Sequence, residues 1–173
     1  MISGRTAAAV TRGVQKHEKC AVTVKHFACN NQETNRYGSN SVVSQRALRE
    51  IYLKGFEICV KEADPKALMT SYNLVNGTHT ANCSDLIDTV LRGEWGFEGI
   101  VMTDWGTTNG KFNLGIHGAS DPALCIKAGN DLMMAGSKED VDGILTGIED
   151  GTITRGELEA CAGRILALSK ELS

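Results

Sequence analysis

The sequence predicts an α/β fold built from four parallel βα units. Apolar, strand-like runs begin near residues 21, 67, 100 and 130. A helical pattern lies between each pair of runs, and the runs themselves are nearly continuous in apolar residues. Alternation of this kind is typical of parallel strands joined by right-handed crossovers. Such units form either a small doubly wound sheet or half of a (β/α)8 barrel, and the pattern alone does not choose between them.

The elements expected in the first half follow from apolar spacing and from residues that begin or end helices. Ala7, Val10 and Val14 recur at helical spacing after Ser3, whose hydroxyl suits the start of a helix. Residues 28–41 form a polar loop of unusual length, which is typical of functional segments. The expected elements are a helix from Ser3 to about Glu18, a strand at 20–27, a helix at 44–63 that Ser44 caps and Asp64-Pro65 ends, and a strand at 66–73.

The second half repeats the alternation and carries stronger end signals. Asn76-Gly77 predicts a turn, Pro122 suits the first turn of a helix, and Thr154 with Glu157 forms a capping box. The expected elements are a helix at 84–95, a strand at 99–105, a short helix at 120–129, a strand at 130–136, a helix from about Lys138 to Glu149, and a last helix to about Lys170.

Composition excludes several classes of protein. No apolar run approaches the ~20 residues that a membrane span needs. The formal net charge of −3 gives no basic surface for nucleic acid, so neither a membrane nor a nucleic acid is an expected partner. None of the six cysteines forms a C-x-x-C pair, so we expect free thiols. No His, Cys or carboxylate cluster has metal-ligand spacing, and no phosphate-binding glycine loop precedes a helix, so we expect no metal and no organic cofactor. The start of the chain lacks an apolar signal segment, which predicts a cytoplasmic location.

The ends of the predicted strands carry polar and aromatic side chains. Ligands of parallel α/β folds bind at the carboxyl ends of the strands, so these side chains mark a candidate site. Each alone has an ordinary explanation, such as a solvated lysine, a structural histidine, a core tryptophan or an aspartate that caps a loop. A carboxylate directly after the run IVMT needs buried partners and is harder to explain in this way. The residues are Lys25, His26, Met69, Tyr72, Asn73, Asp104, Trp105, Asp131 and Met134.

Five ordered blocks carry a resemblance to a known family. They are KHFACNNQETNR, SQRALREIYLKGFE, ALMTSYNLVNG, LRGEWGFEGIVMTDWG and AGNDLMMAG, between about Val24 and Gly136. Together they resemble glycoside hydrolase family 3, in its β-glucosidase branch. The resemblance implies that residues 1–173 are the second half of the family's (β/α)8 TIM-like barrel domain. It implies retaining hydrolysis of terminal β-glucosidic bonds in a β-glucoside or a short oligosaccharide.

The resemblance also assigns roles to single residues. It makes Asp104 the nucleophile, within Thr103-Asp104-Trp105, where the family has Ser-Asp-Trp. The block Met134-Ala135-Gly136 differs from the family's usual Met-Pro-Gly. The substrate-binding residues that the resemblance implies are Lys25 and His26, which hydrogen-bond sugar hydroxyls, Met69 and Tyr72, which line the same subsite, and Trp105, which forms a wall beside the sugar.

The acid/base carboxylate is missing from this interpretation. The N-acetylglucosaminidase branch uses a His and an Asp in the loop at 28–41, and this loop has neither. Glu33 lies nearby, but we expect it to pair with Arg36. The resemblance therefore implies an acid/base Glu on a separate domain that is absent here. The chain would act with the remainder of the barrel and that domain, or self-associate. Two alternatives stay open, an inactive sugar-binding or assembly half-barrel and a Schiff-base aldolase that uses Lys25.

Overall fold

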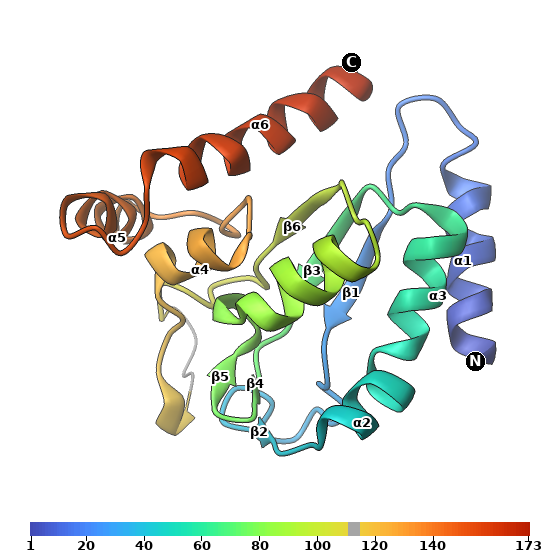
Figure 1. The fold of residues 1–173 in the computed structure, drawn as a ribbon, viewed down its shortest axis with the longest axis horizontal. Coiled ribbons are helices and arrows are strands. Elements are labelled where there is room, and N and C mark those ends of the chain that lie inside the picture. Colours follow the sequence, from blue (N-terminus) through green and yellow to red (C-terminus); the bar gives the residue numbers. More distant parts are fainter. Residues whose placement is uncertain (111–114) are drawn as a thin grey trace.

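The centre of the molecule is a parallel three-stranded sheet. The computed structural model describes residues 1–110 and 115–173. Its sheet has the order β1-β3-β6, with all neighbours parallel. The prediction of an α/β fold with a parallel sheet is confirmed (Figure 1). The three strands are β1 (Thr23–Phe27), β3 (Ala67–Thr70) and β6 (Ile100–Met102).

The prediction of a fourth strand at 130–136 is wrong. The segment lies beside β6, but only Leu132 pairs with it, in one isolated parallel bridge to Met102. Side chains take the place of ladder bonds on both sides of that bridge. The Val101 N–H donates to the Asp131 carboxylate at 2.7 Å, and the Met134 N–H donates to the Thr103 hydroxyl at 3.0 Å. The structure therefore has three parallel strands and an attached, irregular fourth segment.

The first helix buries a different face from the expected one. Helix α1 (Ile2–Val14) packs against α3 (Lys54–Ala63), and the two lie side by side in Figure 1. Its buried residues are Gly4, Ala8 and Thr11, whereas Val10 and Val14 are exposed. Glycine explains the difference, because a Cβ on Gly4 would lie 2.8 Å from the Gly55 carbonyl oxygen. The close approach of the two backbones decides which face is buried.

The helix expected at 44–63 is divided into three parts. Ser44 caps its start as predicted, because its hydroxyl accepts from the Ala47 N–H at 3.2 Å. Asp64 ends the last part in a left-handed conformation. The parts are α2 (Gln45–Ala47), the π-helical segment η1 (Leu48–Tyr52) and α3. A second π-helical segment, η3 (Asp85–Glu94), occupies most of the helix expected at 84–95.

The other elements flank the two ends of the sheet. A small sheet that the sequence did not predict lies beyond one end, and α6 lies beyond the other (Figure 1). The predicted capping box at the start of α6 is confirmed. These elements are β2 (Asn40–Ser41), β4 (Leu74–Val75), β5 (Thr78–His79), η2 (Thr80–Asn82), η4 (Gly115–His117), α4 (Pro122–Ala128), α5 (Lys138–Glu149) and α6 (Arg155–Glu171).

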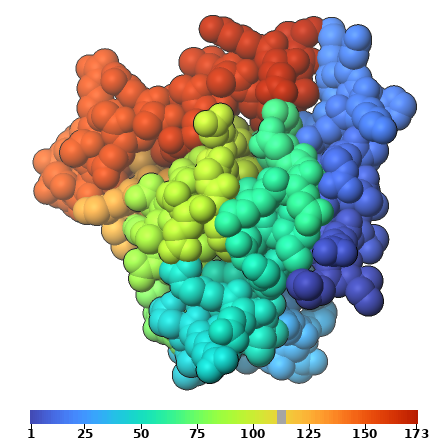
Figure 2. Space-filling view, turned by 45° about the vertical axis from the view of Figure 1, so that its right-hand side comes forward, coloured from blue at the N-terminus to red at the C-terminus, as the bar shows by residue number. Residues whose placement is uncertain are grey.

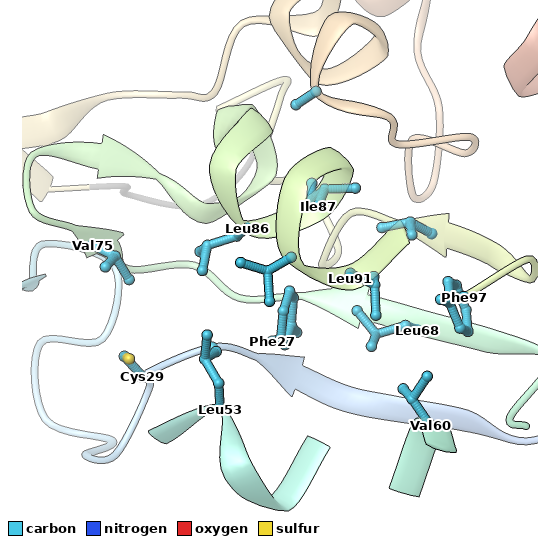
Figure 3. Close-up of a cluster of buried hydrophobic side chains, with 14 of the residues drawn as sticks. Phe27, Cys29, Leu53, Val60, Leu68, Val75, Leu86, Ile87, Leu91 and Phe97 are labelled. Atoms are coloured by element: carbon cyan, nitrogen blue, oxygen red, sulfur yellow. The ribbon is translucent and has the colours of Figure 1, made fainter. Parts of the chain in front are cut away.

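One apolar cluster joins the sheet to its helices. Phe27 of β1, Leu68 of β3 and Leu91 of η3 belong to it, together with Val60 of α3 (Figure 3). The Phe27 ring also meets the rings of Phe56 and Trp95 edge to face, at centroid distances of 5.1 and 6.0 Å. Because Phe27 is the last residue of β1, this packing fixes the carboxyl end of that strand.

The C-terminal end of the chain lies against the segment that joins α1 to β1. Figure 2 shows the end of α6 against the segment around residue 20. Lys19 donates a hydrogen bond to the carbonyl oxygen of Ser173 there. Within the described residues, no helix has the length and apolar character to cross a membrane.

Candidate active site

Asp104 lies just beyond the carboxyl end of β6 and is 4% exposed. Its Oδ1 accepts a hydrogen bond from the Trp105 N–H at 2.8 Å. Its Oδ2 accepts no hydrogen bond from the residues that the structure describes. The Nε2 atom of His26 approaches this oxygen at 3.4 Å, which is within ion-pair distance. One carboxylate oxygen is therefore fixed, while the other is available for chemistry.

His26 reaches Asp104 from the end of β1. Burial is the main influence on the ring and lowers the pKa of His26 below its ordinary value. The Asp104 carboxylate raises this pKa, and the positive charges of Lys25 and Arg36 lower it, with burial prevailing. The imidazole is therefore neutral at neutral pH and can act as a directional hydrogen-bond partner.

Tyr72 stands between the ends of β3 and β6. It is buried, and its hydroxyl donates to the Trp105 carbonyl oxygen at 2.7 Å. Burial raises the pKa of Tyr72, and the Asp104 charge raises it further, so the phenol stays protonated. The guanidinium of Arg36 lies 4.9 Å from the Tyr72 ring centroid, and the Tyr37 ring packs against Tyr72 at 4.5 Å. The long loop at 28–41 thus covers one side of the site.

The other predicted site residues, Met69, Trp105 and Lys25, differ in how close they lie to Asp104. Met69 is buried within β3, one residue before the strand ends, and Trp105 is 51% exposed beside Asp104. Lys25 is exposed, and no hydrogen bond or ion pair holds it within residues 1–110 and 115–173. It lines an open pocket of about 380 Å³ together with His26 and Tyr52. The structure therefore brings together His26, Tyr72, Asp104 and Trp105, but not Lys25 with Asp104.

Sequence reasoning missed two features around this site. Arg36 and Tyr37 pack on Tyr72, and the only signal was the unusual length of their loop. The turn that carries Asp104 is also held from outside, since the Gly106 N–H donates to the Met134 carbonyl oxygen at 2.8 Å. The expected pairing of Glu33 with Arg36 is confirmed, at 2.9 Å.

Asp131 does not share this site, although it was expected there with the other strand-end residues. It lies at the opposite end of the sheet, beside the start of β6. Its carboxylate accepts from Arg92 Nη2 at 2.8 Å and from Arg164 Nε at 2.7 Å. Both oxygens of the completely buried side chain are occupied within the fold, which is typical of a structural role.

The site offers a specific set of chemical groups. A buried carboxylate with one free oxygen can attack an electrophilic carbon or hold a hydroxyl group. The imidazole of His26 and the phenol of Tyr72 supply directional polar contacts, and the exposed Trp105 ring offers a flat face to a sugar. In the part of the chain described, three or more His, Cys, Asp or Glu residues do not gather into a metal-binding group.

The sequence matches known proteins along almost its whole length. The family described as "Glycosyl hydrolase family 3 N terminal domain" matches residues 1–168. The chain is 41% identical to Beta-glucosidase B of Emericella nidulans over 99% of its own length and 19% of that protein. It is 42% identical to the Exo-alpha-(1->6)-L-arabinopyranosidase of Bifidobacterium longum, over 96% of the chain and 20% of that protein.

Solved structures show the same likeness. Beta-glucosidase 3B from Thermotoga neapolitana in complex with glucose superimposes with a TM-score of 0.86 at 38% identity, over 97% of this chain and 23% of that one. A beta-glucosidase from Paenibacillus barengoltzii gives 0.85 at 44% identity, over 98% of this chain and 19% of that one. The chain therefore spans only about a fifth of the length of these relatives.

Proposed function

This chain belongs to glycosyl hydrolase family 3, and from that premise we propose that it supplies the nucleophile of a retaining β-glycosidase, Asp104. The observation that carries the proposal is the carboxylate itself. It is buried at the carboxyl end of a parallel sheet, with Oδ1 held by the Trp105 N–H and Oδ2 free of hydrogen bonds from the described residues. A carboxylate kept so incompletely paired in a buried site is costly unless a ligand uses it.

The proposed chemistry has two displacements. Asp104 Oδ2 attacks the anomeric carbon, the bond to the leaving oxygen breaks, and a glycosyl ester forms on the carboxylate. The acid/base carboxyl group gives its proton to the leaving oxygen in this first step. It then takes a proton from the water that attacks the same carbon, which releases Asp104 as a carboxylate and gives the sugar with retained configuration. The contact from the Trp105 N–H leaves Oδ2 as the attacking oxygen. A sugar hydroxyl bound to His26 would lie beside this oxygen, because Nε2 is only 3.4 Å away.

The proposal assigns the acid/base to a part of the enzyme outside these residues. A retaining glycosidase needs a second carboxyl group about 5–5.5 Å from the first. Glu33, the candidate in the adjacent loop, is exposed and already paired with Arg36. The proposed partners are therefore the remainder of the barrel and an acid/base domain, or a second copy of the chain. The proposed substrate is a terminal β-glucoside or a short oligosaccharide, by analogy with the relatives named β-glucosidases.

The structure also bears on the aldolase alternative and on the expected cellular compartment. A Schiff-base lysine requires a desolvated amine, whereas Lys25 is exposed, so no observation favours the aldolase alternative. All six cysteines are free thiols, including the exposed Cys20, which supports a reducing compartment such as the cytoplasm as part of the proposal.

Covalent trapping tests the proposal. A 2-deoxy-2-fluoro-glucoside with an activated leaving group needs little acid assistance, so it is offered to the longest natural polypeptide that contains these residues. Peptide mass spectrometry should find the sugar ester on Asp104, and Asp104→Asn should abolish it. Asp142→Asn is the matched control, because Asp142 is an exposed carboxylate of α5 paired with Lys138. An ester on another carboxylate, or glucose binding without any ester, would contradict the proposal and favour the inactive half-barrel.

A further inference from the structure

We propose that Thr103 is a positioning residue for the Asp104 carboxylate, acting through Met134. The inference rests on the proposed function, because it concerns how the nucleophile is aimed. Thr103 is completely buried directly before Asp104. It touches no atom that reacts, and its effect passes through the irregular segment beside β6.

Met134 brackets the nucleophile from both sides. Its N–H donates to the Thr103 hydroxyl at 3.0 Å, before Asp104. Its carbonyl oxygen accepts from the Gly106 N–H at 2.8 Å, after Trp105. The N–H and the carbonyl oxygen of Met134 thus bond to the chain on either side of Asp104 and Trp105. We call these two contacts the clamp. The Thr103 hydroxyl is the only side-chain atom in this pair of contacts.

The clamp has a rigid support because the other end of its segment is fixed. The Asp131 side chain is completely buried between Arg92 and Arg164, and it accepts the Val101 N–H at 2.7 Å. The Thr103 N–H then donates to the Leu132 carbonyl oxygen at 3.0 Å. The segment 131–134 is therefore attached to β6 at its base, at its middle and, through the Thr103 hydroxyl, at its top.

Loss of the Thr103 hydroxyl would change the position of the Asp104 carboxylate. Without it, the part-buried Met134 N–H has lost its acceptor and Met134 is free to shift. Gly106 would follow, because its N–H is bound to the Met134 carbonyl oxygen. The Trp105 N–H lies inside the clamp and holds Asp104 Oδ1, so the aim of Oδ2 depends on this arrangement. His26 lies at the end of β1 and makes neither of the two clamp contacts, so its contact with the sugar should change less than attack.

The test separates attack from binding. Asp104 of the longest natural polypeptide is trapped with the activated 2-deoxy-2-fluoro-glucoside, and the rate constant of ester formation is measured apart from the dissociation constant. Thr103→Val keeps the shape of the side chain but removes the acceptor. It should lower the rate constant about 10- to 100-fold, as misplacement of a reacting group does, with little change in the dissociation constant. Thr103→Ser keeps the hydroxyl and should retain the wild-type rate constant.

A matched control uses the same substitution at a remote buried site. Thr11 is as buried as Thr103, and its hydroxyl contacts Cys59 Sγ at 3.6 Å between α1 and α3. Thr11→Val should leave the rate constant unchanged. If Thr103→Val does not fold, Thr103→Cys replaces it, because sulfur is a weaker acceptor, and an intermediate rate constant is then expected. Wild-type trapping by the folded Val or Cys variant overturns the inference alone, whereas a wild-type protein that forms no ester on Asp104 overturns the proposed function with it.

Discussion

Asp104 and Asp131 are two buried aspartates near the opposite ends of β6. Asp131 accepts hydrogen bonds from Arg92, Arg164 and the Val101 N–H, so both of its oxygens are fully occupied. Asp104 receives one such bond, from Trp105, and its Oδ2 receives none from the described residues. A carboxylate that is fully satisfied within the fold has no capacity left for a ligand. The pairing, rather than the burial, distinguishes the structural end of the sheet from the candidate catalytic end.

The largest expected effect comes from neutralising the Asp104 carboxylate. Asp104→Asn should reduce kcat on an activated aryl glucoside on the order of 10⁴-fold or more, as loss of an essential catalytic side chain does. The free energy of unfolding should not fall, because the amide oxygen can still accept from the Trp105 N–H and a buried charge is removed. Steady-state kinetics and urea denaturation measure both quantities. A variant that is strongly destabilised would show that Asp104 is also needed for folding.

Neutralising Asp131 should lower the stability of the protein and spare its activity, the reverse of the result expected at Asp104. Asp131→Asn leaves the partly buried charges of Arg92 and Arg164 without their buried partner, which should cost up to about 3–5 kcal/mol in the free energy of unfolding. Urea denaturation should detect this loss in a protein that still forms the Asp104 ester at low temperature. Glu159→Gln is the control, since its ion pair with Arg155 is exposed and should contribute little. Equal stability of the Asp131 variant and this control would refute the comparison.

A smaller effect is expected from the two basic residues at the end of β1. His26 lies 3.4 Å from Asp104, whereas Lys25 is exposed and makes no recorded contact with it. His26→Ala should lower kcat/KM about 2- to 10-fold, the value of a hydrogen bond between neutral groups. Lys25→Ala should have an effect of the same order only if substrate draws the side chain into the site. Measuring kcat/KM and the melting temperature of both variants would separate a role in substrate binding from a role in stability.

The sequence was sufficient for the fold class because the alternation of strands and helices is a local property. The helix from Lys138 to Glu149 and the capping box of Thr154 with Glu157 were correctly predicted, since each depends on neighbouring residues. The fourth strand was not, because its ladder is replaced by the side chains of Asp131 and Thr103. The π-helical segments and the small sheet of β2, β4 and β5 depend on tertiary contacts and gave no sequence signal.

The candidate site was partly predictable for a related reason. Parallel strands place their carboxyl ends together, so His26, Tyr72 and Asp104 could be expected near one another. Whether a strand-end aspartate is free or paired depends on residues far away in the chain. Arg92 and Arg164 lie 39 and 33 residues from Asp131, and no local pattern indicates that they meet it.

The smallest expected effect concerns pH and two histidines near the carboxyl end of the sheet. Burial lowers the pKa of both His26 and His79 below the ordinary value of 6.5. Between the lowered and the ordinary value, the unfolded chain binds more protons than the folded one, so stability rises with pH in that window. Acidification from pH 7 to about pH 5 should therefore destabilise the protein, by at most about 1.4 kcal/mol per pH unit for each histidine.

The two histidines differ in their neighbours, which links this prediction to the Asp104 carboxylate. The Asp104 charge raises the pKa of His26, whereas the influences recorded on His79 come from burial, His117 and Tyr72. Asp104→Asn should therefore lower the pKa of His26 further and extend its acid-sensitive window, without changing the contribution of His79. Urea denaturation between pH 5 and pH 7 measures the effect in His26→Gln and His79→Gln, each with and without Asp104→Asn. If the contribution of His26 is unaffected by Asp104→Asn, the carboxylate is not charged beside the imidazole, and its assignment as an ionised nucleophile fails.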